Sequence, residues 1–454
     1  MKKIVALILT LCMLLSVAAC GGSNNPSTNN EPTVPPATEP PATEPPATEP
    51  PATETRDPSM GLQYSEYEGY CVVTGIGTCT DTDIVIPSTH SGKPVTAIAS
   101  EAFFRKGGIK SVTIPNSVAS IGQAAFYACT GLKNIIIPGS VASIGQEAFS
   151  DCTGLTGVTI SNGVTNIDPF AFAGCASLQS ITIPGSVTIN GQDALSTCYG
   201  LKESIISEGV VSIGMRAFAY CGSLKSITIP SSVTSIGEEA FRGCNNLTSL
   251  TLSNGVTTIG DGAFWECKSL ASVTVPDSVF SIGKDAFRDC ANLTKVTISN
   301  SITKISAGTF NGCDNLVSVT IPNSVISIDQ SAFAYCGNLS SIMLPESLVS
   351  VDKDAFRSCT NLSMIIIPDG ITSIVTSVFY DCTSLSNITI PESVTSIGTY
   401  TFSGCNTLTN IHFKGSVSQW QNIGKGHSWD EFTPDYTIFC TNGQITKDGT
   451  VTYK

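Results

Sequence analysis

The sequence has little charge, few histidines and few aromatic residues. Of its 454 residues, 13% are charged and 7% are aromatic, and the only three histidines are His90, His412 and His427. A catalytic or metal centre built on imidazole groups therefore has almost no residues from which to form. The net charge of −13 argues against nucleic acid as a partner, because phosphate binding requires an excess of Lys and Arg.

Long hydrophobic runs are also scarce, which excludes a polytopic membrane protein. The longest run, residues 4–15, follows Lys2 and Lys3 and is too short to span a bilayer. A charged start, a short apolar stretch and small residues before a cleavage point predict a signal peptide over residues 1–19. The tetrad that ends at Cys20, Val-Ala-Ala-Cys, resembles the bacterial lipobox. The resemblance implies a lipid on Cys20 and a chain anchored at the extracellular face of the cytoplasmic membrane.

Aliphatic side chains are almost absent from the next segment. Four copies of Pro-Pro-Ala-Thr-Glu begin at Pro35, Pro40, Pro45 and Pro50. Such a segment has nothing with which to form a core, so residues 20–58 are predicted to be a lipidated, disordered stalk of polyproline type. A plain flexible linker and a spacer through a cell wall both fit this composition.

The rest of the sequence is dominated by one repeat. From residue 114 to residue 412 it recurs with a period of 23 residues and without a gap, which gives thirteen units. A fixed period of this length indicates a solenoid. The organisation predicted is an N-terminal cap with a degenerate repeat (59–113), the repeat array (114–412) and a C-terminal cap (413–454).

Each unit alternates apolar residues in a way typical of short strands. Ile135 and Ile137 point inward from one strand, Pro138 ends it, and Val141 and Ile144 form a second inward pair. We expect a repeat solenoid of about 13–14 coils, with parallel short strands on one face, short helical or turn segments on the other and a cap at each end.

The second half of each unit carries a Phe and a Cys. Ala148, Phe149 and Cys152 have spacings that fit a single helical turn, and like residues of stacked units would form columns. The Phe column is broken only by Leu195. The same unit has Asn190 and Ser204 in slots that elsewhere hold a buried Ile, so we expect a local bulge there, either as sequence drift or as a hinge or ligand notch.

These motifs resemble a known family. Leu-x-x-Ile-x-Ile, Ile-Pro-x-Ser-Val-x-x-Ile-Gly and Ala-Phe-x-x-Cys-x-x-Leu, over about residues 80–440, resemble the BspA-type leucine-rich repeat. The resemblance implies a bacterial surface protein with a role in adhesion to host matrix or to neighbouring cells.

Thirteen of the eighteen cysteines occupy one slot, from Cys129 to Cys405. Stacked coils lie about 4.8 Å apart, and equivalent side chains point the same way, whereas a disulfide needs facing Cβ atoms about 3.8 Å apart. A linear column also lacks the converging geometry of a zinc site. We therefore interpret the column as buried thiols and expect no metal, while a disulfide between Cys71 and Cys79 stays open.

Two surfaces are candidates for binding. The outward slots of the strands are rich in hydroxyl groups, and their candidate residues are Ser180, Thr182, Ser226, Thr228, Ser249, Thr251, Ser272, Thr274, Ser318 and Thr320. The slots after the Phe carry irregularly placed aromatic residues, namely Tyr127, Tyr220, Trp265, Tyr335 and Tyr380.

The caps hold further aromatic residues. Tyr64, Tyr67 and Tyr70, together with the apolar stretch at residues 84–86, are expected to close the N-terminal end. Trp420 and Trp429 in the C-terminal cap are interpreted as cap core, with an aromatic binding site as the alternative.

The sequence thus favours a lipid-anchored surface module that binds an extracellular protein, another cell or a polysaccharide. A structural envelope protein without a specific ligand is the alternative. An enzyme is the remote one, because no nucleophile, base or carboxylate pair stands out. No cofactor is implied, and the only membrane contact expected is the lipid anchor.

Overall fold

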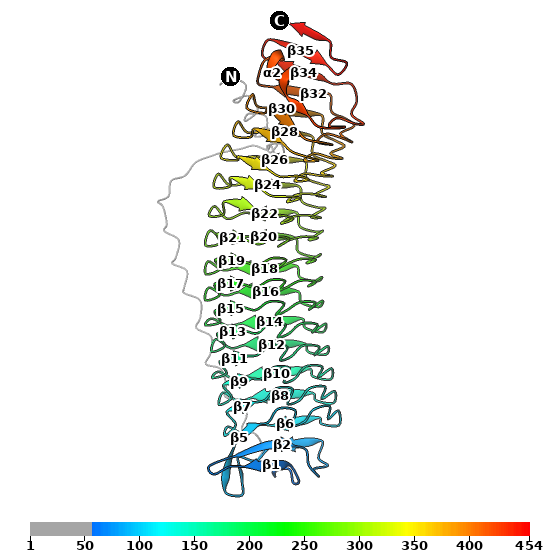
Figure 1. Cartoon of the computed structure of the whole chain (residues 1–454). Coiled ribbons are helices and arrows are strands. Elements are labelled where there is room, and N and C mark those ends of the chain that lie inside the picture. Colours follow the sequence, from blue (N-terminus) through cyan, green and yellow to red (C-terminus); the bar gives the residue numbers. More distant parts are fainter. Residues whose placement is uncertain (1–56) are drawn as a thin grey trace, which may run out of the picture. The chain divides into compact units, whose positions relative to one another are not determined.

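The computed structural model describes residues 57–454, which form one compact unit (Figure 1). The predicted signal peptide, the lipidation site Cys20 and all but the last two residues of the predicted stalk lie outside the described residues.

Two parallel ladders of short strands run along a stack of about 16 turns, and the predicted solenoid is confirmed. In each coil a strand of three or four residues is followed by a strand of two residues. The longer strands of the coils are β3(Asp83–Val85), β6(Ser111–Thr113), β8(Asn134–Ile137), β10(Gly157–Ile160), β12(Ser180–Ile183), β14(Glu203–Ile206), β16(Ser226–Ile229), β18(Ser249–Leu252), β20(Ser272–Thr274), β22(Lys295–Thr297), β24(Ser318–Thr320), β26(Ser341–Met343), β28(Met364–Ile366), β30(Asn387–Ile390) and β32(Asn410–Phe413).

The two-residue strands form the second ladder. They are β7(Ser120–Ile121), β9(Ser143–Ile144), β11(Asn166–Ile167), β13(Ile189–Asn190), β15(Ser212–Ile213), β17(Ser235–Ile236), β19(Thr258–Ile259), β21(Ser281–Ile282), β23(Lys304–Ile305), β25(Ser327–Ile328), β27(Ser350–Val351), β29(Ser373–Ile374), β31(Ser396–Ile397) and β33(Gly424–Lys425). Both ladders are interrupted at the same coil boundary, since neither β26 and β28 nor β27 and β29 belong to one sheet.

The third side of each coil is a turn and not the helical turn expected from the spacing. The amides of Glu147, Phe149 and Asp151 donate to carbonyl oxygens of the next coil, at 2.8–3.0 Å. Helical amides would instead bond back to the residue four positions earlier. Glu147 and Asp151 have left-handed backbones, with φ of 56° and 57°. Stacking between coils therefore replaces local helix formation on this side.

The Phe column occupies the centre of the core. From Phe103 to Phe402 neighbouring rings stack with centroids 5.0–5.8 Å apart, except on both sides of Leu195. Leu195 is itself buried, at 1% exposure, so the core continues through the gap.

The bulge expected at the irregular unit is not formed. Ile189 and Asn190 of β13 pair in unbroken register with Asn166 and Ile167 of β11. The backbone ladder tolerates the substituted sequence because its hydrogen bonds do not depend on the side chains.

Strands in mixed pairing cap the N-terminal end. The strands are β1(Gln63–Glu66), β2(Cys71–Gly75), β4(Thr89–His90) and β5(Lys93–Ile98). The pairs β1 with β2 and β4 with β5 are antiparallel, whereas β2 with β5 is parallel. Tyr64 stacks on His90 with ring centroids 3.8 Å apart, but Tyr67 and Tyr70 are 48% and 41% exposed and stack on each other. The prediction that these two tyrosines close the end is wrong; buried side chains of β2, including Val73, do so.

A short helix and an antiparallel meander cap the C-terminal end. The elements are α2(Val417–Asn422), β34(Thr437–Cys440), β35(Gly443–Thr446) and β36(Val451–Tyr453). The helix begins with a capping box between Ser416 and Gln419. Trp420 is buried against Phe413 and Trp429, so these tryptophans form cap core.

Candidate functional site

The strand face presents its predicted residues outward. All ten of them, from Ser180 to Thr320, are exposed because successive side chains of a strand point to opposite sides. Parallel register aligns them from coil to coil: Ser226 lies beside Ser249, and Thr228 beside Thr251. The hydroxyl columns are therefore real surface features, although their role in binding stays a prediction.

The hydroxyl grid is less uniform than the sequence suggested. Register places Glu203 and Ile205 beside Ser180 and Thr182, and it places Lys295 beside Ser272. Ser and Thr occupy both outward slots in β16, β18 and β20, although β18 and β20 belong to different sheets.

An apolar patch on the same face escaped the sequence reasoning. Met343, Met364 and Ile366 are 77%, 53% and 52% exposed, at the coil boundary where both ladders are interrupted. Register places Met343 beside Thr320, so the patch continues the hydroxyl columns. The sequence does carry a signal for this patch, because these three apolar residues occupy outward slots that hold Ser or Thr in most other repeats.

The five predicted aromatic residues fall in two different slots of the turn side. Tyr127, Trp265 and Tyr380 directly follow the Phe and are half-buried. Tyr220 and Tyr335 lie one position further along, are 38% and 47% exposed, and have left-handed backbones. The two slots therefore differ in exposure and in backbone geometry.

Arginines link these aromatic residues into clusters, which the sequence reasoning also missed. The Arg242 guanidinium carbon lies 3.9 Å from the centroid of the Trp265 ring and 5.7 Å from that of Tyr220. Arg357 lies likewise between Tyr335 and Tyr380, at 6.0 and 4.8 Å. Such cation–π contacts hold the side chains in fixed positions.

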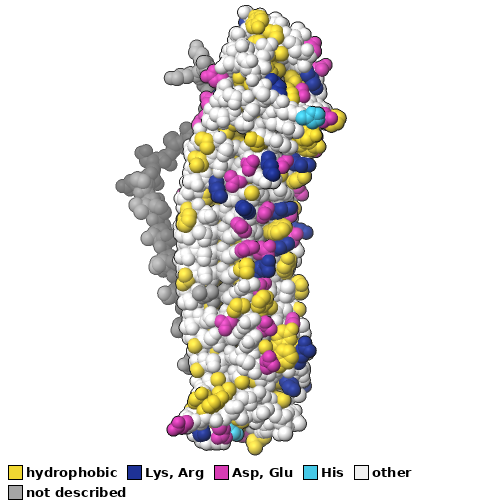
Figure 2. All heavy atoms as spheres, viewed as in Figure 1, with side chains coloured by type: hydrophobic (Ala, Val, Ile, Leu, Met, Phe, Trp, Pro, Cys, Tyr) yellow, Lys and Arg dark blue, Asp and Glu magenta, His cyan; other side chains and the backbone are white. Residues whose placement is uncertain are grey.

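A partly buried carboxylate supports the first cluster. Glu239 pairs with Arg216 at 2.7 Å and with Arg242 at 2.8 Å. Burial alone would raise the pKa of Glu239, but the two guanidinium groups lower it below its usual value. Figure 2 shows charged side chains of both signs gathered along one side of the coils.

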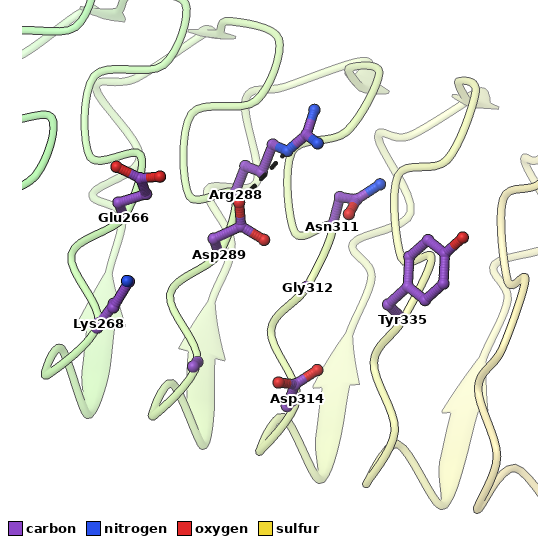
Figure 3. A pocket seen from close by; sticks show the side chains of 9 residues that line it. Glu266, Lys268, Arg288, Asp289, Asn311, Gly312, Asp314 and Tyr335 are labelled. Carbon is purple, nitrogen blue, oxygen red and sulfur yellow. Dashed lines mark ion pairs between the residues drawn. The ribbon is translucent and has the colours of Figure 1, made fainter.

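A hollow of about 490 Å³ lies between the two clusters (Figure 3). Glu266 and Lys268 lie at one end, Tyr335 lies at the other, and Arg288, Asp289, Asn311, Gly312 and Asp314 lie between them. The hollow lies where Gly312 occupies the slot that holds Asp289 in the preceding coil and Tyr335 in the following one.

The cysteine column is buried and protonated. All thirteen thiols have 0% exposure, and each donates a hydrogen bond to a carbonyl oxygen of the preceding coil, such as Cys244 to Phe218 at 3.3 Å. Burial raises the pKa of Cys198 and Cys244 to about 12, which suppresses the reactive thiolate. All sixteen described cysteines are free, including Cys71 and Cys79.

Residues 57–454 contain no group of three or more His, Cys, Asp or Glu side chains placed to hold a metal ion. Over the same range no helix has the length and apolarity needed to cross a membrane.

Gapless coils, two parallel ladders and one central Phe column define a leucine-rich-repeat solenoid protein. The chain belongs to the family described as the BspA type leucine rich repeat region, whose model matches residues 96–223, 211–339 and 303–423. A comparison with curated proteins gives no match.

Two solved structures illustrate the relationship. A leucine-rich repeat protein from Bacteroides ovatus is 27% identical, with a TM-score of 0.71 over 86% of this chain and all of that one. A leucine rich cell surface protein from Faecalibacterium prausnitzii is 31% identical over 83% of this chain and 99% of its own, with a TM-score of 0.43.

Proposed function

We propose that the chain is a lipid-anchored cell-surface module that binds macromolecules through its strand face. The observation that carries this proposal is the outward surface of the longer ladder, where exposed hydroxyl columns adjoin the patch of Met343, Met364 and Ile366. Large exposed apolar side chains next to polar ones are typical of protein interaction sites.

The strand face is suited to recognition because its side chains are held in place. Backbone ladders fix the spacing of the outward residues, so binding would cost little ordering of the surface. Ser and Thr hydroxyls both donate and accept hydrogen bonds, and Met side chains adapt to irregular partners. The ligand class proposed is an extracellular protein, another microbial cell or a polysaccharide.

The surface location rests on the family and on the N-terminal sequence. A relative that is 31% identical is described as a cell surface protein, and Cys20 ends a lipobox-like tetrad. Replacement of Cys20 by Ser is expected to release the chain from the membrane fraction. Continued retention of the C20S chain would contradict lipid anchoring but not binding.

Binding is tested with the full-length chain and a panel of immobilised matrix proteins, polysaccharides and whole microbial cells. We expect saturable binding that Ser226→Lys combined with Ser249→Lys abolishes, and that Met343→Lys combined with Met364→Lys abolishes as well. Thr165→Lys and Thr234→Lys, at exposed positions directly before β11 and β17 of the other ladder, are the matched controls.

The outcomes separate three interpretations. Binding that survives the strand-face changes would place the site on another face. Absence of saturable binding across the panel would contradict the proposal and favour a structural envelope component. The third interpretation, an enzyme, has little support because proteins with this family's fold are typically non-enzymatic.

A further inference from the structure

The hollow on the turn side brings an aromatic ring, charged side chains of both signs and a glycine together. Its walls come from four successive coils, and its floor lies at Gly312, where a Cβ atom would crowd the Asp289 carboxylate. Its volume of about 490 Å³ falls within the range of about 300–1,000 Å³ that is typical of ligand clefts. The site therefore has room for a small ligand or for one unit of a larger one.

Tyr335 forms one wall at a cost in backbone energy. It has a φ of 61°, in a slot that is left-handed in every described repeat, whether it holds glycine, as at 174, 243, 312 and 404, or another residue, as at Asp151 and Asp289. A left-handed backbone costs a non-glycine residue about 1–2 kcal/mol. Tyr335 is 47% exposed, so packing of its ring offsets little of this backbone cost. What distinguishes Tyr335 from Tyr220 in the same slot is its place at the edge of the hollow, where its exposed ring offers a flat apolar face to a ligand.

The polar groups of the hollow offer both donors and acceptors. Carboxylates of Glu266, Asp289 and Asp314 accept hydrogen bonds, and Lys268 and Arg288 donate them. Burial, and after it the charge of Asp289, raises the pKa of Asp314 above its usual value. The lining therefore carries an excess of negative charge, which opposes an anionic ligand.

Arg288 and Asp289 are only partly engaged by other side chains: the Arg288 guanidinium lies 3.4 Å from Asp285 Oδ1 and 5.2 Å from the centroid of the Trp265 ring. Arg288 Nε lies 3.5 Å from Asp289 Oδ2, further than a good hydrogen bond, and the two side chains are 39% and 42% exposed. The indole of Trp265 donates to the same Asp289 oxygen at 3.1 Å, which fixes the carboxylate in position. A hydroxyl group inserted here would accept from the guanidinium and donate to the carboxylate.

We infer that this hollow binds one uncharged sugar residue of a glycan. The apolar C–H face of the sugar ring would lie against Tyr335, and its hydroxyl groups would bridge Arg288 and Asp289. Neighbouring acceptors on Glu266 and Asp314 would engage further hydroxyls. This inference goes beyond the proposed function because it concerns the turn side of the coils, and it can fail while strand-face binding holds.

The test uses the full-length chain and calorimetric titration with soluble oligosaccharides. The probes are cellotetraose, chitotetraose, mannotetraose and galactotetraose as neutral ligands, with an oligogalacturonate and an oligolysine peptide as charged comparators. We expect saturable binding of at least one neutral probe, and Tyr335→Ala weakens it by about tenfold or more. Tyr335→Phe is expected to retain it, because the aromatic face is kept, and Asp289→Asn is expected to weaken it.

Tyr220→Ala is the matched control. Tyr220 occupies the same slot with a φ of 60°, and it lies over Gly243, outside the hollow. We expect the Y220A chain to bind the sugar as the unchanged chain does. Circular dichroism melting curves of both variants show whether a loss of binding comes from unfolding.

Three results would overturn the inference: no neutral probe binds, the charged probes bind in their place, or binding survives Tyr335→Ala in a folded chain. The strand-face changes Ser226→Lys and Met343→Lys should leave oligosaccharide binding intact. If they abolish it, glycan recognition belongs to the strand face, and the hollow is not its site.

Discussion

The thiol of Cys152 donates a hydrogen bond to the carbonyl oxygen of Phe126 in the preceding coil, with Sγ and O 3.1 Å apart. The same carbonyl accepts the amide of Cys129 within its own coil. The contact recurs along the column, for example from Cys267 to Phe241 at 3.3 Å. Cysteine at this slot thus fills space as a small apolar side chain and also gives a buried carbonyl a second partner.

Removal of one column thiol is expected to destabilise the stack locally. Cys267→Ala should cost about 1–2 kcal/mol, because the change leaves a small cavity and removes a weak hydrogen bond to Phe241. Hydrogen exchange of the flanking coils under reducing conditions measures the effect. Cys79→Ala, at a half-buried position of the N-terminal cap, is the control with a smaller expected cost. Equal effects at the two sites would contradict this explanation.

Alkaline pH is expected to destabilise the chain through the same thiols. Burial raises the pKa of Cys198 and Cys244 from 9.0 to about 12, so the unfolded chain binds fewer protons than the folded chain above pH 9. The stabilisation is complete below pH 9 and falls as the pH rises toward 12, by about 1.4 kcal/mol per thiol for each pH unit. The midpoint of denaturant unfolding, followed together with thiolate absorbance, checks this. A midpoint that stays constant across this range would show that the thiols ionise in the folded state.

The Phe column is expected to tolerate Leu better than Ala. Phe264 is fully buried, with ring centroids 5.4 and 5.3 Å from those of Phe241 and Phe287. Phe264→Ala should cost about 3–5 kcal/mol because of the cavity it leaves, whereas Phe264→Leu should cost about 1–2 kcal/mol. Leu195 shows that the slot accepts Leu. Denaturant unfolding gives both values, and similar losses for the two variants would mean that ring stacking and not volume dominates.

Gly312 is expected to be sensitive to substitution. Its φ is 72°, and a Cβ atom would lie 2.3 Å from Asp289 Oδ1. Gly312→Ala should therefore lower thermal stability by about 1–2 kcal/mol, as left-handed strain adds to the crowding of a side chain. Gly222→Ala is the control, since a Cβ atom there meets nothing within 4 Å. A G312A chain as stable as the G222A chain would contradict the strained backbone.

The fold was predictable from the sequence because each unit repeats the same pattern. Ile135, Ile137 and Phe149 lie inward as their spacing predicted, and gapless stacking follows from a constant period. Local spacing misled on the turn side, where the amide of Phe149 donates to the next coil instead of forming a helical turn. It also misled in the N-terminal cap, where nothing in the spacing of Tyr67 and Tyr70 reveals that they stack on each other outside the core.

Of the two candidate sites, the strand face could be predicted from the sequence and the hollow could not. The period of the repeat alone determined which residues form the strand face, because register follows from equal unit length. Only the tertiary structure decided that Tyr335 and Asp289, 46 residues apart, line one hollow with Gly312 at its floor. The reason is physical: the hollow depends on left-handed backbones and on side chains from several coils, and neither has a signal within a single unit.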